Sequence, residues 1–84
     1  MHVVASSRFI RRAHKLKPQN DALLRAALRR FAADPQDPLL RAHKLEGDLA
    51  HYWAFSVDDD LRVLFRWDGE TYFLVGLGTH DEVY

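Results

Sequence analysis

The sequence predicts an α+β fold in the order β-α-α-β-β-β. The expected sheet is small and mainly antiparallel, with about four strands and a two-helix hairpin packed on one face. Two patterns predict this fold. Apolar residues recur at helical spacing through most of the first half, and the second half changes to the two-residue alternation of strands. With 84 residues, 48% of them hydrophobic, the chain can form one hydrophobic core, so we expect a single domain over residues 1–84.

The first strand and first helix are expected at the start of the chain. The β-branched run HVVAS, residues 2–6, is typical of a strand. Ser6 or Ser7 can cap the helix that follows, because a serine oxygen accepts hydrogen bonds from the free N–H groups of a first helical turn. The apolar residues of SRFIRRAHKL have helical spacing: Phe9, Ile10, Ala13 and Leu16.

A second helix is expected after the Lys-Pro step at positions 17–18. The first helix ends there because the residue before a proline avoids the α region. The segment NDALLRAALRRFAADP is rich in alanine, which favours a helix with Asn20 or Asp21 near its N-terminus. Two prolines end it, and its buried stripe is expected to consist of Leu24, Leu28 and Phe31.

Three further strands are expected in the second half. The segments HYWAFSV and LRVLFRW alternate, and the run DDD between them forms a turn. The first segment has Trp53, Phe55 and Val57 on one face, and the second has Arg62, Leu64 and Arg66 opposite its apolar face. Asp68-Gly69 predicts a hairpin in which both central residues have positive φ. ETYFLVGLG is almost entirely apolar, which indicates a central strand covered on both faces.

The net charge of zero hides a polarity between the two halves. Residues 1–45 carry ten Lys or Arg against three Asp, giving +7, and residues 46–84 carry two Arg against nine Asp or Glu, giving −7. This indicates either a basic surface that faces a polyanion or a partner, or two halves that neutralise each other. The chain has no cysteine and no apolar run suited to a signal peptide or membrane span, so we expect a cytoplasmic protein.

Several side chains are candidates for chemistry on RNA. His43 lies in the polar segment RAHKLEGD and His80 follows the last strand, while Asp60 and Arg62 share one side of an extended strand. Cleavage of RNA by its own 2′-hydroxyl needs a proton acceptor, a cation for the phosphorane charge and a proton donor for the 5′-oxygen. Histidine can fill either proton role, arginine matches phosphate oxygens, and a tyrosine such as Tyr84 can stack on a base or hold a phosphate.

The alternative is an ordinary surface, because five histidines among 84 residues produce such sets by chance. Against it, Gly76 and Gly78 thin the last strand, so that the backbone can turn sharply and bring His80 over one sheet face. Asp81 and Glu82 are expected to be solvated. No HxH or HExxH spacing is present, so we predict no metal site and no cofactor.

Four segments spread over nearly the whole chain form a recognisable set: SRFIRRAHKL, HKLEGDLAHYW, DDDLRVLFRW and GLGTHDEVY. The set resembles the RelE/ParE superfamily of toxin–antitoxin toxins, and within it the YafQ-like ribosome-dependent mRNA interferases. The resemblance implies the toxin of a type II toxin–antitoxin system, an endoribonuclease that cleaves translated mRNA and inhibits translation. Its implied partners are a cognate antitoxin, the ribosome and mRNA, with no membrane. The alternatives are a ParE-like, non-catalytic inhibitor of DNA gyrase, or a degenerate toxin that only binds its antitoxin.

The resemblance also implies roles for individual residues. His43 and His80 stand where YafQ-like toxins have histidines implicated in proton transfer, Asp60 stands at the acidic position, and Tyr84 stands at the terminal aromatic position. We favour His80 as the general acid, with His43 or Asp60 as the base. Deletion of residues 83–84 should then reduce activity more than folding.

Arg62 stands where RelE-type relatives have the arginine that contacts the scissile phosphate. We expect Lys44 and Arg66 to add contacts to RNA phosphates. The sequence departs from the YafQ-like pattern at Ser56, where those enzymes carry a further histidine, and the nearby His51 is not its equivalent.

Overall fold

One mixed sheet organises the computed structural model, which describes residues 1–84. Its five strands have the order β1-β5-β4-β3-β2, in which β1 runs parallel to β5 and the other neighbours are antiparallel. The strands are β1 (His2–Ala5), β2 (His43–Lys44), β3 (Trp53–Ser56), β4 (Leu61–Trp67) and β5 (Thr71–Thr79). The predicted α+β class is therefore confirmed, with one more strand than expected.

The additional strand is β2, in the segment that the sequence presented as polar and loop-like. It has only two residues, so the chain shows no alternation there that could predict a strand. Its backbone nevertheless pairs with β3, His43 opposite Ala54 and Lys44 opposite Trp53. The strand β5 lies inside the sheet between β1 and β4, as expected of its apolar sequence.

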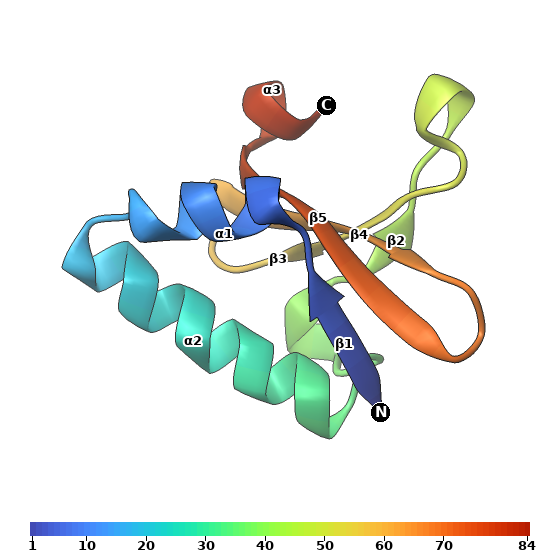
Figure 1. The fold of residues 1–84 in the computed structure, drawn as a ribbon, viewed down its shortest axis with the longest axis horizontal. Coiled ribbons are helices and arrows are strands. Elements are labelled where there is room, and N and C mark those ends of the chain that lie inside the picture. Colours follow the sequence, from blue (N-terminus) through green and yellow to red (C-terminus); the bar gives the residue numbers. More distant parts are fainter.

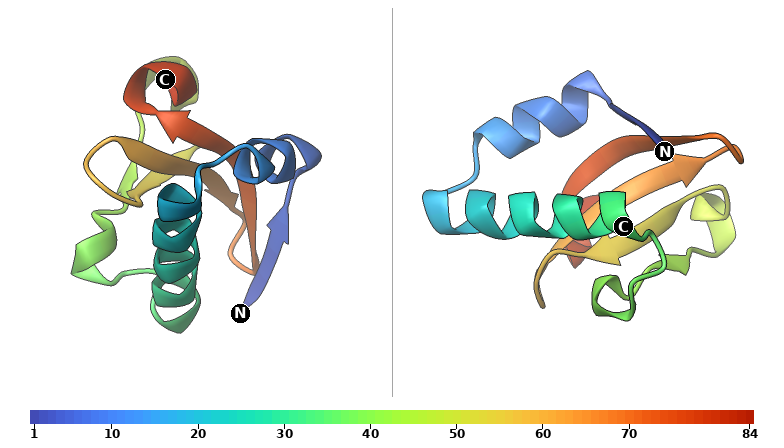
Figure 2. Two further views of the ribbon diagram at one scale, coloured as in Figure 1. Left: turned by 90° about the vertical axis from the view of Figure 1, so that its left-hand side faces the viewer. Right: turned by 90° about the horizontal axis from the view of Figure 1, so that it is seen from below.

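Two long helices and one short helix accompany the sheet: α1 (Ser7–His14), α2 (Pro18–Ala33) and α3 (His80–Val83), together with the 3-10 turns η1 (Pro38–Leu40) and η2 (Gly47–Leu49). The sheet separates α2 from α3, and α1 packs beside β5 (Figures 1 and 2). Ser6 caps α1 as predicted, because its Oγ accepts the N–H of Phe9 at 3.1 Å. The helix α2 begins at Pro18, which has no N–H that would need a partner in a first turn, and Asn20 and Asp21 lie near its N-terminus as predicted.

The core lies between α2 and the sheet. Phe31 of α2 is 1% exposed and meets three rings of the sheet, with centroids 4.8 Å from Phe55, 5.2 Å from Phe65 and 5.0 Å from Tyr72. These distances are within the range of favourable aromatic contacts. The predicted stripe on α2 is confirmed, because Leu24 is buried and Leu28 packs against the same cluster.

The turn between β4 and β5 differs in detail from the prediction. Only Gly69 has positive φ, at 99°, and Asp68 does not. The carboxylate of Asp68 instead accepts the N–H groups of Glu70 at 2.9 Å and Thr71 at 2.8 Å. These bonds, mainly the one from the Thr71 N–H, lower the pKa of Asp68. The hydrogen bonds that the Asp68 carboxylate accepts therefore stabilise this turn, and a second residue with positive φ is not needed.

The face of the sheet opposite α2 is the one that we call the open face. Paired residues on neighbouring strands lie on the same side of a sheet. One row across the open face contains Ser56, Arg62 and Gly78, and the next contains His43, Ala54, Leu64 and Gly76. The helix α3 stands over this face, so the face with the candidate residues is also the face above which the chain ends (Figures 1 and 2).

Candidate active site

The pairing of β4 with β5 brings three of the predicted site residues to one end of the sheet. Leu61 pairs with Thr79 and Arg62 pairs with Gly78. Asp60 immediately precedes this end of β4, and His80 immediately follows the same end of β5. Antiparallel register alone therefore brings the backbone positions of Asp60, Arg62 and His80 to one end of the sheet, from segments about 20 positions apart in the chain.

Arg62 lies on the open face with its guanidinium partly buried. Its Nη1 donates a hydrogen bond to Ser56 Oγ at 3.1 Å, and Ser56 itself is 7% exposed. The Nε of Arg62 is buried without a hydrogen-bond partner. A buried donor without an acceptor costs about 1–3 kcal/mol, so stability does not explain this placement. A cation held at such a cost is typical of a functional position.

His80 and Tyr84 are presented together by α3. His80 is the first residue of the helix and Tyr84 follows its end, so the two side chains are one helical turn apart. Their rings meet edge to face, with centroids 4.4 Å apart and an angle of 87°. The Nδ1 of His80 lies 3.5 Å from a carboxylate oxygen of Asp81. The ring of His80 is exposed, so a substrate on the open face can reach it.

His43 belongs to the same face but not to the same cluster. It lies on the edge strand β2, three strand spacings from β5, which is roughly 14 Å between backbones. Its Nδ1 lies 3.0 Å from the carbonyl oxygen of Arg41. A carbonyl only accepts, so Nδ1 carries the proton and Nε2 of the neutral ring has a free lone pair. His43 thus has the tautomer that a general base needs, and only a substrate that spans the open face could contact both histidines.

The remaining predicted residues are less favourably placed. Lys44 shares its row with Trp53 and Phe65, which belong to the helix-covered side, so it does not face the same way as His43. Arg66 lies on the open face at its far end, with its guanidinium carbon 5.8 Å from the centre of the Phe73 ring. The structure therefore separates both residues from Arg62.

A pocket of about 520 Å³ lies between α3 and the β2–β3 connection. Leu64 and Gly76 belong to the open face, Tyr52 is the one aromatic residue of its lining, and α1 contributes Arg8 and Arg12 to its rim. Glu82 also lines the pocket, and its carboxylate pairs with Arg12, which leaves Arg8 as the unpaired cation of the rim. An aromatic ring and such a cation can hold a nucleotide, because bases stack on rings and phosphates pair with arginine. This pocket continues the Arg62 end of the open face toward the middle of the sheet.

Sequence reasoning missed Glu82, which was expected to be solvated. Its carboxylate accepts the N–H of Thr79 at 2.8 Å, and Thr79 Oγ1 accepts the N–H of Glu82 at 3.4 Å. This is a capping box, and the spacing Thr-x-x-Glu at positions 79–82 could have predicted it. The bond from Thr79 N–H is the main cause that lowers the pKa of Glu82.

The donor set does not suggest a metal centre. No three His, Asp or Glu side chains are grouped so that they could hold an ion. None of the helices combines the length and the apolar character that crossing a bilayer requires.

The α+β fold is similar to that of solved RelE/ParE-like toxins, as predicted, although the fifth strand and the short C-terminal helix were not expected. The YoeB/ParE toxin from Agrobacterium tumefaciens has a TM-score of 0.76 at 18% identity, over 95% of this chain and 99% of that chain. YafQ from Escherichia coli strain BL21(DE3) has a TM-score of 0.76 at 17% identity, over 98% of this chain and 96% of that chain.

A third similar structure is the toxin–antitoxin complex RelBE2 from Mycobacterium tuberculosis. Its matching chain has a TM-score of 0.67 at 25% identity, over 94% of this chain and 96% of that chain. No family model matches this sequence, and no curated protein sequence matches it. The likeness therefore lies in the fold rather than in a sequence signature.

Proposed function

We propose that this protein is the toxin of a type II toxin–antitoxin system and that it cleaves translated mRNA on the ribosome. The observation that carries the proposal is Arg62, a half-buried cation on the open face, at the sheet end where His80 and Tyr84 are held. The fold of the protein is also similar to that of YafQ and of the matching chain in RelBE2, which supports a toxin role. Such a protein would act in the cytoplasm, where ribosomes and mRNA are.

The proposed chemistry is attack of the 2′-hydroxyl on the adjacent phosphate, without a metal. Arg62 binds the scissile phosphate and stabilises the charge of the phosphorane. His80 donates a proton to the leaving 5′-oxygen, and His43 Nε2 or Asp60 accepts the proton of the 2′-hydroxyl. Tyr84 fixes the His80 ring from one side through the edge-to-face contact. The wide separation of His43 from α3 favours Asp60 as the base for a nucleotide bound at Arg62.

The first test is primer extension on mRNA translated by purified ribosomes. His80→Ala should reduce the cleavage rate by roughly 10²–10⁴-fold, because a positioned acid contributes about that much. His14→Ala is the matched control, since His14 is also an exposed helical histidine but lies on α1, away from the site. Equal cleavage by wild type and His80→Ala would remove His80 from the mechanism.

A cognate antitoxin is the second partner of the proposal. RelBE2 is a toxin–antitoxin complex, and the edge strand β1 of this chain exposes Val3 and Val4. An open edge with apolar side chains can add a strand of a partner. Co-expression with the neighbouring reading frame should yield a stable complex without cleavage activity. Purification of the toxin alone from such cells would count against this partner.

The ParE-like alternative predicts a different target. One of the fold relatives is described as a YoeB/ParE toxin, so the fold alone does not separate the two activities. A supercoiling assay with DNA gyrase decides between them. Inhibition of gyrase by a protein that leaves translated mRNA intact would favour the non-catalytic function, and activity in neither assay would favour a domain that only binds its antitoxin.

A further inference from the structure

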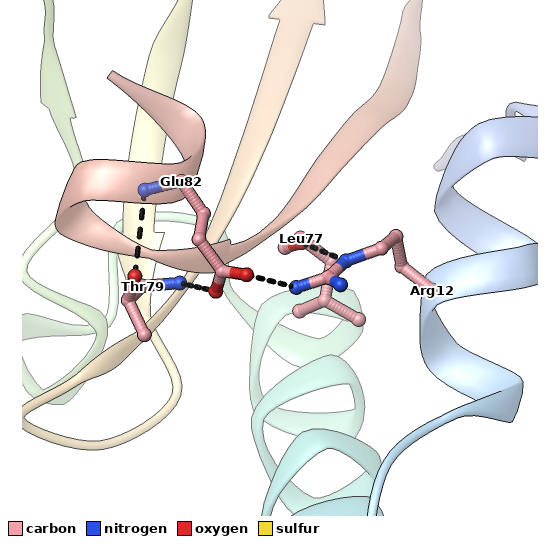
Figure 3. A network of polar contacts seen from close by, with 4 residues as sticks. All are labelled: Arg12, Leu77, Thr79 and Glu82. Carbon is pink, nitrogen blue, oxygen red and sulfur yellow. Dashed lines mark hydrogen bonds and ion pairs between the residues drawn. The ribbon is translucent and has the colours of Figure 1, made fainter.

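Arg12 of α1 reaches across to the end of β5 and to α3 (Figure 3). Its Nε donates to the carbonyl oxygen of Leu77 at 3.1 Å, and its Nη2 donates to a carboxylate oxygen of Glu82 at 2.9 Å. One planar guanidinium therefore joins α1 to residues of β5 and α3 that lie 65 and 70 positions further along the chain. A lysine has no such fork, so it could not make both bonds in this geometry.

Glu82 connects Arg12 to the beginning of α3. One carboxylate oxygen binds Arg12, and the other accepts the N–H of Thr79 at 2.8 Å. Both carboxylate oxygens are thus engaged, and the lowered pKa of Glu82 reflects these bonds, the one from Thr79 N–H first. The chain Leu77–Arg12–Glu82–Thr79 is continuous in Figure 3.

Gly78 makes room for this connection. A Cβ at Gly78 would lie 2.9 Å from Glu82 Cβ, 3.0 Å from Glu82 Oε1 and 3.3 Å from Arg12 Nη2. Its backbone has no positive φ, so a left-handed turn is not what requires a glycine at this position. The close passage of the Glu82 side chain is what requires the missing Cβ.

The helix held in this way is too short to be stable alone. Four residues form barely one turn, and isolated helices of that length do not persist in water. An exposed ion pair alone also contributes little, and Arg12 and Glu82 are 39% and 48% exposed. The capping box, the carbonyl bond and the ion pair act on one helix, so their combination can fix its position.

We propose that Arg12 is a positioning residue, which through Leu77 and Glu82 clamps α3 so that the rings of His80 and Tyr84 stand at a fixed place beside Arg62. The inference rests on the proposed function, in which His80 and Tyr84 act on RNA. Arg12 itself acts through α3 and does not contact the reacting atoms. A displacement of about 1 Å in such a site can reduce a rate by up to roughly a hundredfold.

The first measurement does not depend on activity. Amide exchange of Thr79, Glu82 and Tyr84, whose N–H groups are bonded within the capping box and α3, is followed by NMR in wild type and Arg12→Ala. Exchange of these three amides should be about tenfold faster or more in the variant. The ring-current shift that Tyr84 imposes on the His80 ring protons should shrink as well. Unchanged exchange and unchanged ring shifts would overturn the clamp.

The second measurement separates positioning from substrate contact. Arg12→Ala should lower kcat for mRNA cleavage by roughly tenfold to a hundredfold with KM within about twofold, and Arg12→Lys should lie between the variant and wild type. Arg11→Ala is the control for kcat and for α3, because Arg11 is exposed on the same helix and its removal changes the charge equally. As a cation of the helical surface it can affect KM, but kcat and the exchange of the α3 amides should stay at the wild-type values. A loss of kcat with α3 still ordered would overturn positioning, and so would disordered α3 with full kcat.

Failure of the proposed function gives a different pattern. Wild-type protein would then cleave no mRNA, while exchange and ring shifts would still respond to Arg12→Ala if the clamp exists. The two conclusions can therefore fail separately.

Discussion

Two nitrogens of the Arg62 guanidinium differ in their hydrogen bonding. Its Nη1 donates to Ser56 Oγ, whereas its Nε is buried without an acceptor. Ser56 therefore supplies the hydroxyl that accepts from the arginine. The hydroxyl fixes the plane of the guanidinium, which decides how well its fork meets a phosphate.

Replacement of Ser56 by alanine tests that relation. Ser56→Ala should lower the free energy of unfolding by about 1–2 kcal/mol, because Arg62 Nη1 loses its acceptor beside the unpaired Nε. It should also lower kcat/KM for mRNA cleavage, since the guanidinium is then free to rotate. Ser56→Thr retains the hydroxyl and should keep most of both quantities. Urea unfolding and cleavage assays on the three proteins measure them, and an Ala variant with unchanged stability would contradict the role of this bond.

At the scale of elements, α3 is the feature that the sequence left least defined. In the segment GTHDEVY the sequence predicted site residues and solvated carboxylates but no helix, yet the segment contains a helix with a capping box and a long-range ion pair. Thr79 and Glu82 have the spacing of a capping box, so the helix could have been predicted from local chemistry. The contact to Arg12 could not, because it depends on where α1 packs relative to β5.

The other elements followed their local patterns to different degrees. The strands β3, β4 and β5 alternate or are continuously apolar, and Ser6 caps α1, so these features were predictable. The two-residue strand β2 was not predictable, because two residues are too few to show an alternating pattern. For the site, the approach of Asp60, Arg62 and His80 follows from the hairpin register, whereas the distance of His43 from α3 depends on strand order.

Attachment of α3 should depend on pH through Glu82. The pKa of Glu82 is lowered in the folded protein, mainly by the bond from Thr79 N–H, with smaller contributions from the Thr79 side chain and Arg12. A lowered carboxyl pKa means that the docked helix binds the proton more weakly than the undocked one. The stabilisation is therefore present above the ordinary pKa of about 4.3 and is lost as pH falls through the lowered value.

The measurement is an NMR titration of the Glu82 side-chain carboxyl together with the amides of α3. Both should change in the same pH range, below about 4.3, and Arg12→Ala should move the midpoint upward toward the ordinary value. Glu82→Gln should remove the dependence of α3 on pH in that range. Amide shifts of α3 that stay constant from neutral pH to pH of about 2.5 would show that the carboxylate does not hold the helix.

For the whole molecule, the ion pairs show how little the two oppositely charged halves contact each other directly. Only two ion pairs join the basic first half to the acidic second half, Arg12 with Glu82 at 2.9 Å and Arg41 with Asp59 at 3.4 Å. Both are exposed, and such pairs contribute about 0–1 kcal/mol. Mutual neutralisation through paired contacts therefore does not account for ten cations in residues 1–45. Six of them lie on α1 and α2, where Arg12, Arg25 and Arg30 are already paired with carboxylates. The helical surface therefore offers a polyanion three unpaired cations, Arg8, Arg11 and Arg29.

Arg29 of α2 is exposed and has no ion pair, which makes it a suitable probe of this surface. If the helical surface faces ribosomal RNA, affinity for purified ribosomes should fall linearly with salt on a logarithmic scale, and Arg29→Ala should reduce the slope by about 1. Stability should change by less than about 0.5 kcal/mol, because the side chain is exposed. Glu70→Gln is the control, since it changes the charge by one unit in the β4–β5 turn and should not weaken binding. A binding constant independent of salt, or an unchanged slope for Arg29→Ala, would mean that the basic helices do not face the polyanion, and that their charge serves the antitoxin instead.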